Sequence, residues 1–156
     1  ESAQEDESAY DQFSASDAPI IKLVNGILVK AVQDGISDIH IEPSPATKSL
    51  SIRFRVDGLC QEYMNVPNSM ARAILSRIKI MGGLDIAERR LPQDGKIKFR
   101  RFAPLDIELR VATVPTAGQN EDVVLRLLST GKPMPLDEME DLWQQAKLLH
   151  RQEGIE

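Results

Sequence analysis

Two arginines, Arg110 and Arg126, have the residue type and spacing for binding an anion. Each lies in a segment where apolar and polar residues alternate, which is typical of a strand with one face toward water. The apolar residues of each segment share one face, so the arginine takes the other. A hairpin centred near Gly118 would join the segments, and each arginine is eight residues from that glycine. The two arginines are therefore predicted to face each other.

Like charges placed opposite each other destabilise a sheet by a few tenths of a kcal/mol up to about 1 kcal/mol. A bound anion would relieve this repulsion, and the planar guanidinium group binds phosphate through two parallel hydrogen bonds. Arg110 and Arg126 are therefore a candidate anion site. The alternative is an asymmetric loop, with each arginine paired to a separate carboxylate.

The elements that would position this pair alternate between helical and strand patterns. Apolar residues at helical spacing predict a helix over 19–33, capped by Asp17 and stopped near Gly35, and a second helix over 67–81 that ends at Gly82. The turn signal Asp57-Gly58 predicts a hairpin. The predicted strands cover residues 37–43, 50–56, 59–64, 96–102, 105–113 and 122–128. The order helix, three strands, helix, three strands predicts an α+β fold with a mostly antiparallel sheet covered by helices.

Charge is distributed unevenly along the 156 residues, whose net charge is -5. Residues 1–18 carry six acids and no Lys or Arg, which predicts a disordered acidic tail. Residues 19–134 carry 17 basic and 12 acidic residues, a local charge of +5. The acidic total argues against a nucleic-acid partner. The single cysteine, Cys60, and the absence of an apolar run of about 20 residues favour a reducing, cytoplasmic setting.

Several common catalytic and binding motifs are absent from the sequence. It has no Walker A loop, no H-E-x-x-H, no cysteine pair for zinc and no dinucleotide-binding glycine motif. Asp38, His40 and Glu42 would share one strand face, which is compatible with a metal site, but a polar strand face without metal is the favoured interpretation. Cys60 is interpreted as a small core or hairpin residue rather than a nucleophile. An enzyme acting unaided is therefore not predicted.

Several strings resemble the segment that precedes the ATPase domain in the hexameric ATPases of type II secretion and type IV pilus assembly. The strings, in order along residues 18–130, are A-P-I-I-K-L-V-N (18–25), S-D-I-H-I-E-P (37–43), R-F-R-V-D-G (53–58), D-I-A-E-R-R-L-P-Q-D-G (85–95), L-R-V-A-T (109–113) and V-L-R-L-L (124–128).

The resemblance implies a PAS-like domain over 19–130, followed over 131–156 by an interdomain linker and the start of a RecA-like ATPase domain. Arg110 and Arg126 match family arginines that reach the nucleotide phosphates, which gives them the role of arginine fingers. The resemblance implies ATP and Mg in the parent protein and no cofactor in this domain alone. The implied partners are the ATPase domain, neighbouring subunits of a ring of six and inner-membrane platform proteins. The implied location is cytoplasmic, peripheral at the inner membrane.

Two positions depart from the family pattern. Lys96 follows Gln-Asp-Gly, where the family usually has arginine, so it is a candidate nucleotide-binding residue without the guanidinium fork. Glu108 replaces the usual aspartate. Two other functions stay open: a module that binds cyclic dinucleotides, and a scaffold that docks on platform proteins through its acidic ends.

Overall fold

The computed structural model describes residues 14–44 and 46–128. The helices are α2 (Ala18–Gln33) and α3 (Asn68–Met81), and the strands are β1 (Asp38–Ser44), β2 (Ser49–Val56), β3 (Leu59–Pro67), β4 (Gln93–Lys98), β5 (Glu108–Pro115) and β6 (Glu121–Leu128). The predicted α+β order is confirmed. Most of the predicted tail and the whole predicted linker lie outside the described residues. Within the described ranges, no helix combines the length and apolar character needed to cross a membrane.

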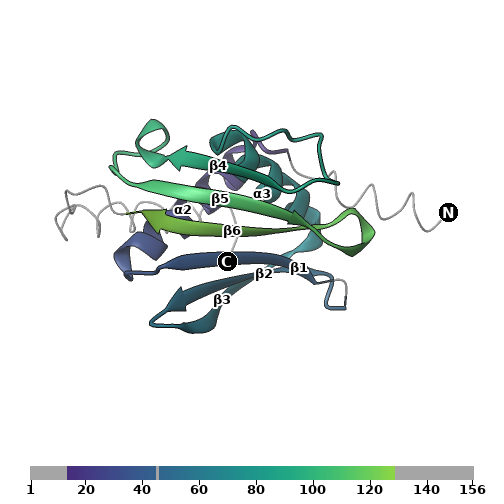
Figure 1. The fold of residues 1–156 in the computed structure, drawn as a ribbon, viewed down its shortest axis with the longest axis horizontal. Coiled ribbons are helices and arrows are strands. Elements are labelled where there is room, and N and C mark those ends of the chain that lie inside the picture. Colours follow the sequence, from purple (N-terminus) through teal and green to yellow (C-terminus); the bar gives the residue numbers. More distant parts are fainter. Residues whose placement is uncertain (1–13, 45, 129–156) are drawn as a thin grey trace.

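The six strands form one sheet in the order β3-β2-β1-β6-β5-β4, and every neighbouring pair is antiparallel (Figure 1). Three strands come from each half of the chain, and the β1–β6 pairing joins the halves. Helix α3 connects the two edge strands, β3 and β4. Residues distant in sequence are therefore neighbours at the centre of the sheet.

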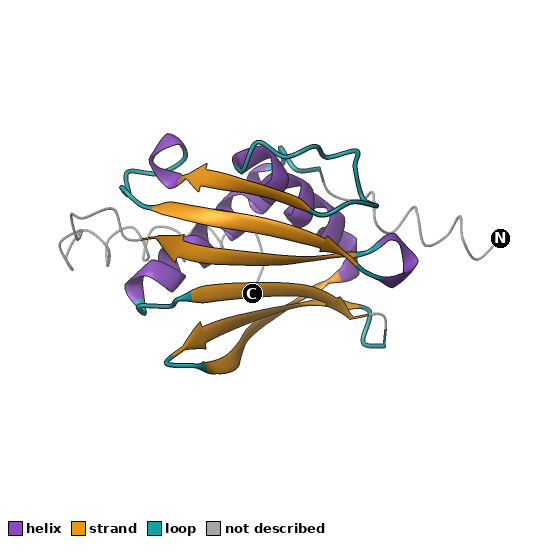
Figure 2. Ribbon diagram, viewed as in Figure 1, coloured by secondary structure: helices purple, strands orange, loops and turns teal. Residues whose placement is uncertain are grey.

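Both helices cover the same face of the sheet (Figure 2). The apolar faces predicted for them are buried: Ile20, Leu23, Val24, Ile27, Leu28 and Ala31 on α2, and Met70, Ile74, Ile78 and Met81 on α3. The strands bury alternate residues against these helices. Their intervening polar residues therefore lie on the opposite face, which no described helix covers.

Glycines at two places allow turns and close contacts that other residues would hinder. Asp57 and Gly58 both have positive φ (51° and 79°), as the predicted two-residue hairpin turn requires. A Cβ on Gly95 would lie 2.5 Å from the carbonyl oxygen of Gly82, so β4 packs directly against the end of α3. Gly82 and Gly95 thus fix the edge of the sheet against the helix layer.

The predicted strand over 96–102 is wrong in its bounds. The observed strand β4 ends at Lys98, and the chain then turns through a 3-10 helix, Phe99–Arg101. Phe99 is fully buried, and its carbonyl accepts hydrogen bonds from the backbone N–H groups of Phe102 (2.8 Å) and Ala103 (3.0 Å). The next strand begins at Glu108 rather than 105, although Leu105 is buried. Burial of a connecting segment produced the apolar pattern that predicted a longer strand.

Candidate functional site

Three cations from neighbouring strands lie in one line across the sheet. Lys96 on β4 is paired with Arg110 on β5, and Arg110 with Arg126 on β6. The line continues through Asp38 on β1 to Arg55 on β2. Because directly paired residues of an antiparallel sheet point to the same face, these five residues form one charged row. The prediction that Arg110 faces Arg126 is confirmed.

The charged row lies on the face opposite the helices. Leu109, Val111 and Leu125, which flank the two arginines along their strands, are fully buried in the core beneath the helices. The side chains of Arg110 and Arg126 are 60% and 68% exposed. The arginines of the row are therefore accessible, and the sheet and its hydrophobic core separate them from α2 and α3.

The loop between β5 and β6 sets the arginine register. The backbone N–H of Thr116 donates to Asn120 O at 2.8 Å, and Asn120 Nδ2 donates to Ala117 O at 3.1 Å. Gly118, at the tip, has a φ of 75°. These contacts close the hairpin about Gly118, so the alternative of an asymmetric loop is wrong.

Lys96 and the two arginines nevertheless each have their own carboxylate, as the same alternative proposed for the arginines. Arg110 Nη2 lies 2.9 Å from Asp94 Oδ2, and Arg126 Nε lies 3.0 Å from Asp38 Oδ1. Lys96 Nζ lies 3.3 Å from Glu108 Oε2. The sheet therefore tolerates the adjacent cations without a bound anion, and the case for the site rests on exposure and alignment rather than on unrelieved repulsion.

Asp38 is the buried anchor of the row. Its side chain is only 9% exposed, and it accepts hydrogen bonds from Arg126 Nε and from Ser37 Oγ (3.1 Å). Burial raises the pKa of Asp38, but the hydrogen bonds from Arg126 and Ser37 outweigh it and lower the pKa below its usual value. The ionised carboxylate holds the Nε edge of Arg126, and no described residue accepts a hydrogen bond from its terminal amino groups. Sequence reasoning missed this role, although alternation placed Asp38 on the correct face.

Asp38, His40 and Glu42 are not assembled as a metal site. Asp38 is engaged by Arg126, and Glu42 by Arg53 on β2. No group of three metal-ligating side chains is found in the part of the chain that the structure describes. The triad is thus a polar strand face whose carboxylates pair with arginines.

Cys60 lies on the hairpin strand β3 and is exposed. The hairpin part of its interpretation is confirmed. The core alternative is wrong, because Cys60 lies in the exposed first half of the edge strand β3.

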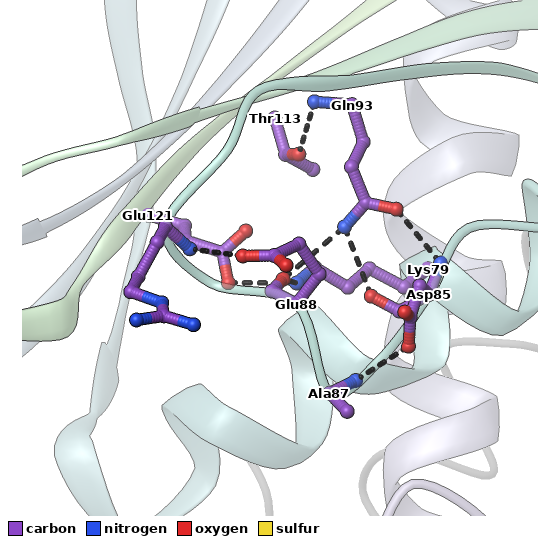
Figure 3. Close-up of polar contacts among 8 residues, drawn as sticks. Lys79, Asp85, Ala87, Glu88, Gln93, Thr113 and Glu121 are labelled. Atoms are coloured by element: carbon purple, nitrogen blue, oxygen red, sulfur yellow. Dashed lines mark hydrogen bonds and ion pairs between the residues drawn. The ribbon is translucent and has the colours of Figure 1, made fainter.

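A buried ion pair on the helix side escaped sequence reasoning altogether. Lys79 Nζ on α3 donates to Glu121 Oε1 at 2.7 Å, with the two side chains 3% and 5% exposed, and also to Glu88 O at 2.8 Å (Figure 3). Gln93 Nε2 also holds the segment between α3 and β4, because it donates hydrogen bonds to the carbonyls of Asp85 and Glu88. The pair joins α3 to β6, and no sequence motif links two residues so far apart in the chain.

Comparisons with known proteins show which family this chain resembles. The family model described as "Type II/IV secretion system protein" matches residues 14–152. The chain is 49% identical over 115 residues to "Type IV pilus assembly ATPase PilB" of Myxococcus xanthus, covering 74% of this chain and 20% of that protein. It is 48% identical over 133 residues to "Type II secretion system protein E" of Xanthomonas campestris pv. campestris, covering 82% of this chain and 23% of that protein.

A third relative, "Type II secretion system ATPase E" of Vibrio cholerae, is 48% identical over 115 residues, covering 74% of this chain and 22% of that protein. The chain thus spans about a fifth of the length of the curated relatives it matches. Both the pilus and the secretion branches appear among the relatives at similar identity. The chain belongs to the type II/IV secretion system protein family.

Proposed function

We propose that this chain is the domain that precedes the ATPase domain in an ATPase of type II secretion or type IV pilus assembly, and that its charged row binds the phosphates of ATP held by that domain. One observation carries the proposal: Lys96, Arg110 and Arg126 occupy adjacent register positions on the exposed sheet face. Three aligned cations suit a polyphosphate, whose charges are also arranged in a line.

The two arginines are suited to different parts of this task. Arg126 is held at Nε by buried Asp38, so its terminal amino groups have a fixed direction. Arg110 pairs with Asp94, whose side chain is 59% exposed, and can exchange that carboxylate for a phosphate oxygen at little cost. Lys96 adds a point charge without bidentate geometry. Together they would stabilise the charge that develops on the transferred phosphoryl group.

Contact with the nucleotide would also couple this domain to the hydrolysis cycle. ATP and Mg would be held by the ATPase domain, and the charged row would close on the phosphates when ATP is present. Loss of the γ-phosphate would weaken that contact and release the domain. Such motion within a ring of six subunits could be transmitted to inner-membrane platform proteins.

Steady-state ATP hydrolysis by the full-length protein tests the proposal. We expect Arg110→Ala and Arg126→Ala each to lower kcat. Arginine fingers contribute about 10³- to 10⁵-fold to kcat, which sets the upper limit of the loss. Arg101→Ala is the matched control, because Arg101 is an exposed arginine in the 3-10 turn outside the row. Wild-type turnover in both row variants would refute the proposal, and tight binding of a cyclic dinucleotide to the isolated chain would favour the binding-module alternative.

A further inference from the structure

The two helices carry positive charge only. Neither contains an acid, and their charged residues are Lys22 and Lys30 on α2 and Arg72, Arg77 and Lys79 on α3. The helix side of the domain therefore differs from the opposite sheet face, where the lysine and the two arginines of the charged row each have a carboxylate.

The connection between α3 and β4 adds two arginines, Arg89 and Arg90, and neither forms an ion pair with a described residue. The two acids of the connection bind its own backbone instead. Asp85 Oδ1 accepts a hydrogen bond from the N–H of Ala87 at 3.0 Å. Glu88 Oε1 accepts one from the N–H of Arg90 at 2.8 Å. These contacts hold the connection in place and leave its arginine side chains uncompensated.

A cavity of about 130 Å³ lies between α3, this connection and the loop before β6. Its lining combines two arginines, Arg72 and Arg89, with two apolar residues, Leu75 and Ile86. The buried ion pair also lines the cavity but is neutral as a whole. A cavity of about 150 Å³ holds one benzene molecule, so this smaller one fits a single carboxylate side chain rather than a separate organic ligand.

Residues 1–13 have the composition that complements this surface. They contain five acids, no Lys or Arg, and two aromatic residues, Tyr10 and Phe13, on either side of Asp11. Carboxylates form strong hydrogen bonds with guanidinium groups, and aromatic rings pack favourably against arginine. A segment with too few apolar residues to fold alone can bind a partner surface through such contacts.

The attachment of this segment brings it to the helix side. Ser14, the first described residue, lies four residues before the start of α2, and its backbone N–H donates to Asp17 Oδ2 at 2.9 Å. Thirteen extended residues span up to about 45 Å, whereas a compact domain of this size has a radius of gyration of about 13 Å. The segment is therefore long enough to reach the cavity. Covalent attachment also keeps its effective concentration there on the order of millimolar.

We infer that residues 1–13 bind to the helix side of this domain, with their carboxylates at Arg72 and Arg89 of the cavity. The charged row is the less favourable site for them, because its lysine and two arginines already pair with carboxylates and lie on the opposite face. The contact forms within one chain, and it does not depend on the proposed ATPase role.

Paramagnetic relaxation enhancement in the 156-residue chain tests the inference. A nitroxide is attached at Ser8→Cys in a Cys60→Ser background, and the broadening of backbone amide signals is measured. We expect the signals of Arg72 and Arg89 to be broadened much more than that of Arg110 on the other face. About 1 M NaCl, where the Debye length falls to about 3 Å, should remove most of this difference. Equal broadening on both faces, strongest broadening at the charged row, or a pattern unchanged by salt would overturn the inference.

A charge reversal assigns the contact to the cavity. Arg89→Glu should reduce the broadening at Arg72 at least twofold. The matched control Arg101→Glu, in the exposed 3-10 turn, should leave it unchanged. Equal effects of the two substitutions would show that only the overall charge matters and would contradict binding at the cavity.

Neutralising the segment itself is the complementary change. The combined variant Glu5→Gln/Asp6→Asn/Glu7→Gln/Asp11→Asn should also reduce the broadening at Arg89 at least twofold. It leaves the sequence of the described domain unchanged, so it decides the question if Arg89→Glu fails to fold. Undiminished broadening in this variant would refute the role of the carboxylates.

Two further samples identify the occupant. A label at Gln144→Cys reports on residues 135–156, which are also acidic. Stronger broadening at Arg89 from this label than from Ser8→Cys would assign the cavity to that segment and overturn the inference. In the second sample, nitroxide-labelled chains are mixed with isotope-labelled chains that carry no nitroxide. Broadening at Arg89 in this mixture would place the segment of a second copy in the cavity and contradict a contact within one chain.

Discussion

The charged row and the buried Lys79–Glu121 pair use the same chemistry in opposite environments. Their cation–carboxylate distances are similar, at 2.9 Å for Arg110–Asp94 and 2.7 Å for Lys79–Glu121. The side chains are 60% and 59% exposed in the first pair and 3% and 5% exposed in the second. Distance alone therefore does not reveal what an ion pair does: water screens the first pair and is excluded from the second.

This contrast separates two roles. An exposed pair can exchange one partner for an incoming anion, because both charges remain solvated during the exchange. A buried pair cannot, because either charge would be left desolvated. Arg126–Asp38 is intermediate, with an exposed guanidinium and a carboxylate that is 9% exposed. Replacing the cation of each of these three ion pairs should lower the free energy of unfolding by a different amount.

The largest effect is expected from Lys79→Met. This change leaves the Glu121 carboxylate buried without its cation, and breaking a buried pair in this way costs about 3–5 kcal/mol. Urea unfolding of the purified chain at pH 7 measures the loss. Lys79→Met also removes the donor to Glu88 O, which should loosen the connection between α3 and β4.

The double variant Lys79→Met/Glu121→Leu is the control for this prediction. With both charges replaced by apolar groups, most of the lost stability should return, because buried pairs often contribute little compared with apolar packing. A single variant within about 1 kcal/mol of wild type would show that water reaches the pair and that it is not buried in solution.

A smaller effect is expected from Arg126→Ala, about 1–3 kcal/mol at pH 7, because Asp38 keeps only Ser37 as a side-chain donor. The folded-state pKa of Asp38 is lowered, so the stability it contributes is complete above its ordinary pKa near 4 and is lost as the pH falls through the lower folded value. The difference between wild type and Arg126→Ala should therefore shrink below about pH 4. Urea unfolding at several pH values measures it, and a difference independent of pH would contradict the anchoring role of Asp38.

Much of the fold could be predicted from sequence because its signals are local. Apolar spacing located both helices, the Asp57-Gly58 dipeptide located a hairpin, and symmetry about Gly118 gave the register that opposes Arg110 and Arg126. Each of these signals lies within one element or one turn. The face on which each arginine lies followed from the same alternation.

The contacts that were missed depend on how elements meet. Asp38 reaches Arg126 only because β1 pairs with β6, which joins the two halves of the sheet. Lys79 meets Glu121 across the packing of α3 on the sheet. The strand predicted over 96–102 ends early because Phe99 is buried in a 3-10 turn. The local apolar pattern is the same for a buried turn and for a buried strand. Tertiary packing determines the two ion pairs and the end of β4.

The smallest effect on stability is expected from Arg110→Ala, within about 0.5 kcal/mol of wild type, because exposed ion pairs contribute little and the change also removes repulsion from Arg126. Urea unfolding in low and high salt should give nearly the same small difference. Asp94→Ala is the matched control, since it breaks the same pair and leaves Arg110 in place. In the full-length protein only Arg110→Ala should lower kcat for ATP. If both variants lowered kcat equally, the intact pair rather than the arginine would be required, and partner exchange at the charged row would be wrong.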